Sequence, residues 1–179
     1  MPKTPRLSRA FVARAGAVVA VLALSFPLTA CQGDTHPGTA AIVGGQAITE
    51  ADVTQAVYEL QPLMGQQVSR AAMVNGLVAS RMYLDAASEL GIELTDEEFE
   101  QQMGDQVEAL GGDITALGAS SRLILEPGLV MEIATSIGAG DSLGELAVQV
   151  PFEINPRYGS GNPLAEGMSL AEPLADSFR

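Results

Sequence analysis

The chain has 179 residues, which is enough for one ordinary domain and short for two. Its 22 acidic residues outnumber nine basic ones, and four of the basic residues lie within the first thirty positions, where no acidic residue occurs. From Cys31 onward, five arginines face 22 acidic side chains, a net charge of about −17 by formal count. This charge excludes nucleic acid and anionic lipid headgroups as partners, because both need positive charge. It permits basic or unfolded polypeptides as partners. The alternative is that the negative charge serves only to keep an exported protein soluble.

The first thirty residues carry the pattern of a bacterial lipoprotein signal peptide. A positively charged start is followed by the apolar run 15–26, and residues 28–31 (LTAC) place small side chains before a cysteine. Cys31 is the only cysteine, so its thiol is the one group able to carry a thioether-linked diacylglycerol, and no internal disulfide can form. We therefore expect a signal peptide at 1–30, cleavage before Cys31 and a lipid anchor on the extracytoplasmic side of the cell membrane.

Two other interpretations of this segment stay open. An uncleaved anchor would need an apolar run of roughly 20 residues, which is longer than residues 15–26 provide. An ordinary signal peptide with an incidental Cys31 would show the same charge and hydropathy pattern. The position of the sole cysteine directly after small residues favours lipidation over both.

After the lipid site, residues 31–40 are polar and rich in turn formers, which predicts a flexible tether. Residues 41–43 form a brief apolar run before two glycines, a pattern typical of a short strand that enters a tight turn. A threonine N-cap with an acidic residue three positions later (residues 49–52) matches a capping box. Apolar residues at helical spacing then predict a helix over about 50–60, and Pro62 is expected to stop it.

Residues 66–90 predict a long helix that ends at Gly91 in the left-handed conformation. The apolar residues of this helix spread around most of its circumference, which indicates burial against other elements or against a partner. A second capping box at residues 95–98 begins another helix, which carries apolar side chains on one face and ends at the glycine pair 111–112.

The rest of the chain predicts shorter elements and a return to extended structure. The expected elements are a helix at about 113–125, a break at Pro127-Gly128, a helix at 129–137, a loop at 138–144 and a strand at about 147–155. Apolar residues that alternate with a period of two mark this strand, and Pro151 indicates an edge position. Residues 159–179 are polar and rich in turn formers, so we expect a loosely ordered tail.

These patterns predict a mainly α fold. The domain is a multi-helix module of residues 41–158, bracketed by two short strands, at about 41–43 and 147–155, that could pair with each other. The signal peptide and the tether precede this domain, and the polar tail follows it.

Two stretches resemble a known family of chaperones. Residues 43–53 (VGGQAITEADV) resemble the opening V-N-G-x-x-I-T-x-x-D-V of the N-terminal domain of SurA- and PrsA-type foldases, with Gly44 in place of the usual asparagine. Residues 87–99 (ASELGIELTDEEF) are similar to the A-x-x-x-G-I-x-V-T-D-E-E-V junction of that family, at a fitting spacing. The resemblance covers about residues 43–135. Residues 155–159 (NPRYG) are similar to a closing strand in actinobacterial lipoproteins of this group.

The resemblance implies a SurA N-terminal-like chaperone module that assists protein folding in the cell envelope. Larger foldases of this group also carry a parvulin-type prolyl isomerase domain, with histidines in its site. The interval between Ile137 and Val148 leaves no room for such a domain. The resemblance therefore implies the chaperone module without isomerase activity.

The residues after the signal offer no catalytic constellation. His36, the only histidine, lies beside a proline in the tether, where we expect it to be solvated. The acidic run 96–98 points in different directions on a helix and lacks the alternating oxygen ligands of a calcium loop; first-turn acids that favour the helix macrodipole explain it. The serines have no histidine partner. We predict no enzyme, no metal and no cofactor.

A binding role remains. Six apolar side chains are predicted to line a peptide-binding groove: Met73, Leu77, Val78, Met82, Phe99 and Met103. Flexible thioethers adapt to varied apolar partners, which suits a surface that meets unfolded segments. Plain core packing is the alternative for each of these side chains.

Two functional hypotheses follow. In the first, the protein is an ATP-independent holdase that binds unfolded or newly exported polypeptides and is held on the lipid bilayer through acylated Cys31. In the second, it is a structural or adaptor lipoprotein that docks one specific envelope protein. No small-molecule substrate is evident. A third hypothesis, binding of a small molecule between the helices, stays open and would require a closed apolar pocket.

Overall fold

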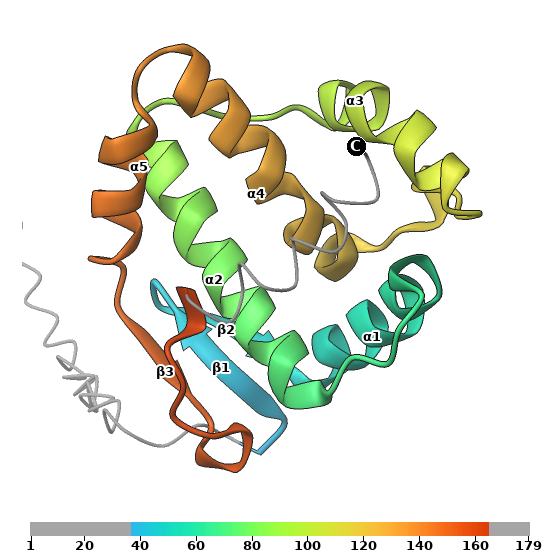
Figure 1. Ribbon diagram of the computed structural model, residues 1–179. Coiled ribbons are helices and arrows are strands. Elements are labelled where there is room, and N and C mark those ends of the chain that lie inside the picture. The colour runs from blue at the N-terminus through green and yellow to red at the C-terminus, as the bar shows by residue number, and fades with distance from the viewer. Residues whose placement is uncertain (1–36, 165–179) are drawn as a thin grey trace, which may run out of the picture. The chain divides into compact units, whose positions relative to one another are not determined.

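Two segments from opposite ends of the domain pair in a small antiparallel sheet (Figure 1). The computed structural model describes residues 37–164 and places β1 (Thr39–Val43) between β2 (Gln46–Thr49) and β3 (Phe152–Ile154). In the central strand, Val43 lies opposite Gln46 on one side and opposite Phe152 on the other. The predicted pairing of two short strands that bracket the helices is confirmed.

β2 is an addition to the predicted elements. Gly44 and Gly45 adopt φ values of 55° and 81°, and two successive positive φ values are typical of a two-residue hairpin turn. This turn folds the chain back along β1, so that residues 46–49 form ladder hydrogen bonds before the first helix begins. The pattern of β2 is weak because Ile48 is its only buried residue.

The end of the domain differs from the prediction in extent. α5 (Gly140–Ala147) occupies most of the predicted loop 138–144, and the predicted strand 147–155 is reduced to the three residues of β3. Leu143 and Ala147 lie one helical turn apart and are fully buried, so packing of this face stabilises a helix that its two glycines disfavour. β3 lies at the edge of the sheet, which confirms the position indicated by Pro151.

Two prolines lie inside helices and do not end them. α1 (Glu50–Met64) continues past Pro62, and α4 (Ala119–Ser136) continues through Pro127. The predicted stop before Pro62 and the predicted break at Pro127-Gly128 are therefore wrong. A proline removes one backbone hydrogen bond from a helix. In α4, buried side chains on both sides of Pro127, Leu125 and Leu129, hold the helix against its neighbours despite that loss.

Capping residues set several helix ends as predicted. α1 and α3 (Asp96–Ala109) begin at complete capping boxes, formed by Thr49 with Asp52 and by Thr95 with Glu98. α2 (Arg70–Glu89) begins later than predicted, at an N-cap serine, and Gly91 follows its end with a φ of 71°. A single 3₁₀ turn, η1 (Ile114–Ala116), replaces the first part of the predicted helix 113–125. A second such turn, η2 (Pro156–Tyr158), follows β3.

α2 is the centre of the core. Eleven of its 20 residues are buried, and it contacts α1, α4, α5 and β1 (Figure 1). This confirms the prediction that a helix apolar around most of its circumference is buried by other elements. One cluster of core residues joins the sheet, α1, α2, α3 and the first half of α4, and a second joins the ends of α2 and α4 to α5. Both clusters belong to the compact unit Gly33–Arg179.

Some predictions fall on residues whose structure is not described. These are the signal peptide, Cys31, His36 and the tail beyond Leu164. Within residues 37–164, none of the helices combines the length and the hydropathy needed to cross a bilayer.

Candidate functional site

The six side chains predicted to bind peptides lie in the core. Phe99, Met73, Leu77 and Val78 are 0% exposed, Met82 is 1% exposed and Met103 is 5% exposed. They contact one another and other apolar residues of α1, α2 and α4 in a single cluster. As a docking surface they are therefore closed in this structure, and a polypeptide could reach them only if the helices separated. Core packing describes their present role.

Other large apolar side chains remain on the surface of the described residues. They are Tyr58, 82% exposed, Ile137, 64%, Val148, 63%, and Phe152, 44%. Val148 and Phe152 lie at the end of the domain: Val148 directly follows α5, and Phe152 is in the edge strand β3. The period-two pattern around Pro151 was the sequence signal for this edge, although it did not identify Phe152 as an exposed residue.

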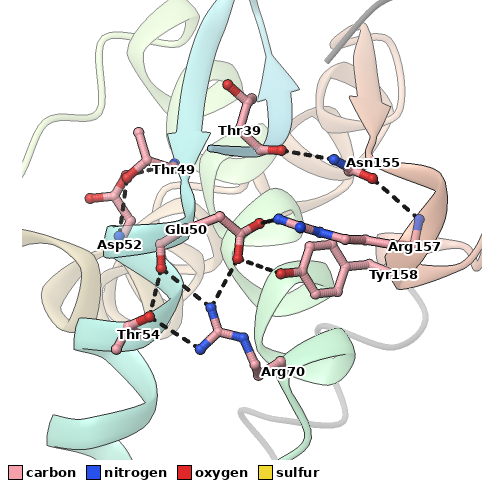
Figure 2. Close-up of polar contacts among 9 residues, drawn as sticks. All are labelled: Thr39, Thr49, Glu50, Asp52, Thr54, Arg70, Asn155, Arg157 and Tyr158. Atoms are coloured by element: carbon pink, nitrogen blue, oxygen red, sulfur yellow. Dashed lines mark hydrogen bonds and ion pairs between the residues drawn. The ribbon is translucent and has the colours of Figure 1, made fainter. Parts of the chain in front are cut away.

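A polar cluster around Glu50 joins the start of the domain to its end (Figure 2). The Glu50 carboxylate accepts hydrogen bonds from Arg70 Nη2 at 2.9 Å and from the Tyr158 hydroxyl at 2.5 Å, and it also forms an ion pair with Arg157. Arg70 donates a second hydrogen bond, of 3.1 Å, to the Thr54 hydroxyl. Glu50 thus receives three donors from α2 and η2, which lie far from it in sequence. We call Glu50, Arg70, Arg157 and Tyr158 the Glu50 cluster.

Asn155 connects the η2 turn to the sheet by hydrogen bonds. Its backbone N–H donates to the carbonyl of Ala40 at 2.9 Å, and its side-chain amide donates to the carbonyl of Thr39 at 3.1 Å. The side-chain oxygen of Asn155 accepts from the Arg157 N–H at 3.3 Å and so shapes η2 (Figure 2). The NPRYG segment therefore closes the domain by contacting both β1 and α1. The sequence indicated the segment but not its partners.

Electrostatics favour the ionised form of Glu50. Partial burial alone would raise the pKa of Glu50, but the hydrogen bonds from Tyr158, Arg70 and Arg157 outweigh burial and lower the pKa below its usual range. The carboxylate thus stays charged at neutral pH. Its chemistry is that of a fixed anion that holds cationic and hydroxyl partners in place.

An acidic residue of α1 also caps α4. Gly118, the N-cap of α4, has no side chain for this purpose, and Glu59 supplies one from the neighbouring helix. The Glu59 carboxylate accepts from the Gly118 N–H at 2.8 Å and from the Ser121 hydroxyl at 2.6 Å. Partial burial would raise the pKa of Glu59, yet these hydrogen bonds lower it. An anion at the positive end of a helix is favourable, so this contact is structural.

An open hollow of about 560 Å³ lies between the β1–β2 turn, the end of α2 and the end of α5. Asp85 and Glu89 line it from α2, together with the polar Gln46 and Gln149 and the apolar Val150. Burial raises the pKa of Asp85, an effect that the charge of Arg81 opposes. Residues 37–164 contain no histidine or cysteine, and none of their acidic side chains are grouped so that they could hold a metal ion.

These features define a small helical module that is built around one buried helix and closed by a sheet and a polar cluster. The chain belongs to the family of SurA-like N-terminal domains, whose family model matches residues 8–111. Domains of this family are chaperone-related foldase modules. Neither a curated protein nor a solved structure matches the chain. α4, α5, β3 and η2 lie beyond the matched residues.

Proposed function

We propose that the protein is an extracytoplasmic lipoprotein of the cell envelope that binds unfolded or newly exported polypeptides without ATP and without catalysis. Membership in the family of SurA-like N-terminal domains is the observation that carries this proposal. The signal-like sequence before Cys31 supports export and anchoring by acyl chains.

The charge of the domain supports a polypeptide partner. Residues 37–164 contain 18 acidic residues and four arginines. All four arginines already have partners in the fold: Arg70 and Arg157 with Glu50, Arg122 with Asp96, and Arg81 with Gln46. Most carboxylates therefore face water without a cation. Such a surface attracts basic segments of unfolded chains and repels nucleic acid.

Suppression of aggregation tests the chaperone function. The unit that starts at Gly33, added in modest molar excess to several chemically denatured clients, should lower the light scattering that follows their dilution. An acidic globular protein of similar mass is the control, because it reproduces the charge without the family's domain. If the protein and this control gave the same light scattering for every client, the holding of unfolded chains would be refuted.

Burial of the six predicted peptide-binding residues favours a second candidate, an adaptor that docks one specific envelope protein. A closed core offers little apolar surface for varied clients, whereas one defined patch can serve one partner. Crosslinking in cells discriminates between the two candidates. Many heterogeneous products support the chaperone, and one stoichiometric product supports the adaptor.

Replacement of the proposed lipidation site should release the protein from the membrane. In Cys31→Ser the hydroxyl cannot form the thioether, so we expect loss of incorporated palmitate label and a shift from the membrane fraction to the soluble fraction. Ala30→Gly, which keeps a small residue before the cysteine, is the matched control and should retain both properties. Unchanged labelling of Cys31→Ser would show that Cys31 carries no lipid.

A further inference from the structure

The outer edge of β3 has free backbone groups. Gly44 N–H donates to the carbonyl of Pro151 at 2.9 Å, and Asn155 N–H donates to the carbonyl of Ala40 at 2.9 Å. In an antiparallel ladder, hydrogen-bonded positions alternate along a strand. The backbone polar groups of residues 151, 153 and 155 therefore point toward β1. Those of Phe152 and Ile154, both N–H and C=O, point away from it. Nothing within residues 37–164 hydrogen-bonds these outward groups, since β3 pairs with β1 alone.

Apolar surface accompanies these groups. Phe152 and Ile154 lie opposite Val43 and Ala41, so they share the face of the sheet that packs on the core. The two residues of β1 are fully buried, whereas Phe152 at the edge is 44% exposed. Beside this edge lies an open hollow of about 500 Å³, lined by Phe152, Ile154, Pro156 and residues 159–161. A strand added here would gain hydrogen bonds and cover apolar side chains at once.

Charge decides what kind of chain fits. Glu153 lies between Phe152 and Ile154 and points to the opposite face of the sheet. Two copies of this edge, paired around a twofold axis at Glu153, would oppose one carboxylate to another between two acidic domains, which is unfavourable. Residues 165–179 are also acidic, with three acidic residues and one arginine. A cation opposite Glu153 would instead form a favourable cross-strand pair.

We propose that the outer edge of β3 docks an extended polypeptide segment with the pattern apolar–Lys/Arg–apolar. The segment adds a fourth strand to the sheet: its cation lies opposite Glu153, and its two apolar side chains cover Phe152 and Ile154. This inference rests on the proposed function, for which it supplies the binding site and the sequence preference of the client.

Binding of short labelled peptides to the full chain in detergent micelles tests this site, with empty micelles as the blank. The probe is a fluorescein-labelled nonapeptide of threonines around a central Val-Lys-Val. We expect it to bind at least about tenfold more tightly than its Val-Glu-Val counterpart and its backbone N-methylated counterpart, because these lose the ion pair and the strand hydrogen bonds respectively. The probe should also slow hydrogen exchange of the Phe152 and Ile154 amides. Equal affinity of the N-methylated peptide, or unchanged exchange at these amides, would overturn the proposal.

A variant on the protein side gives a second, independent measurement. Ile154→Pro removes one outward donor and leaves the hydrogen bonds between β3 and β1 chemically possible, because the N–H of residue 154 does not face β1. It should weaken binding of the Val-Lys-Val probe at least about tenfold, whereas Ile154→Val keeps the donor and should bind like the unchanged chain. Equal binding by a folded Ile154→Pro variant would contradict docking at this edge. If the probe binds as expected but aggregation is not suppressed, the docking site is supported and the holding of unfolded clients is refuted. If Ile154→Pro suppresses aggregation as well as the unchanged chain does, the holding function is supported and this edge is not its binding site.

Discussion

Replacing Phe99 by alanine should lower the free energy of unfolding by about 3–5 kcal/mol. Phe99 is fully buried and is among the largest buried side chains of the described residues. The substitution removes the apolar contacts of its ring and leaves a cavity that the surrounding helices can fill only in part. The loss also removes the contact of the Arg122 guanidinium, which lies 4.5 Å from the ring centroid. Denaturation with urea, followed by circular dichroism, measures the effect.

The same variant separates the two interpretations of the six predicted peptide-binding residues. Tyr58→Ala is the matched control: its aromatic side chain is 82% exposed, so we expect a change within about 0.5 kcal/mol. If Phe99→Ala kept its stability and lost only its binding of denatured clients, Phe99 would contact clients and the packing role would be wrong. A large loss of stability supports the closed core.

Replacing Glu50 by glutamine should lower the free energy of unfolding by about 1–2 kcal/mol. Glutamine keeps the shape of the side chain but removes the charge that Arg70, Arg157 and Tyr158 contact. The expected loss is smaller than for a buried ion pair, because the side chains of Arg70 and Arg157 are 44% and 52% exposed to water. Glu100→Gln is the control, since Glu100 is exposed and forms no ion pair or hydrogen bond with the described residues.

The contribution of Glu50 should depend on pH in a defined direction. Its pKa is lower in the folded protein than in the unfolded chain, so the unfolded state binds the proton more readily. The stabilisation is therefore fully present above the unfolded pKa, about 4.3, and is lost as pH falls through the folded pKa. The difference in stability between the original protein and Glu50→Gln should shrink over that acidic range. A difference that stays constant from neutral pH to below this range would show that the charge of Glu50 is not involved.

Hydrogen exchange locates the effect. Glu50 contacts η2 through Arg157 and Tyr158, whereas Asn155 joins η2 to β1. Glu50→Gln should therefore speed amide exchange at residues 157 and 158 more than within α2. This local loosening matters for function because η2 directly follows β3, the strand with the proposed docking edge. Uniform acceleration over the whole domain would mean that the Glu50 cluster stabilises the fold globally and does not fasten this end of the chain in particular.

The local signals of the sequence predicted the helix starts and ends that depend on local hydrogen bonds. Thr49 and Thr95 start helices because each forms a reciprocal cap with an acid three residues later. Gly91 follows the end of α2 because glycine adopts positive φ without steric strain. The motif at residues 87–99 also indicated the family through local signals, because it consists largely of helix caps and turns. The helix ends predicted at Pro62 and Pro127 were wrong, because packing of the surrounding helix outweighed one missing backbone hydrogen bond.

The sequence by itself determined the family and the mainly helical class, and it located the two bracketing strands, β1 and β3. Only the tertiary structure decided which apolar side chains lie in the core or at the surface, and which carboxylates gain hydrogen-bond or ion-pair partners. Hydropathy says that Met73 and Phe99 avoid water, but not whether the covering atoms belong to this chain or to another, and here they belong to this chain. Glu50 gains its partners at residues 70, 157 and 158 by folding, and Phe152 stays at an open edge because no described strand follows it in the sheet. Such contacts join residues far apart along the chain, so no local pattern encodes them.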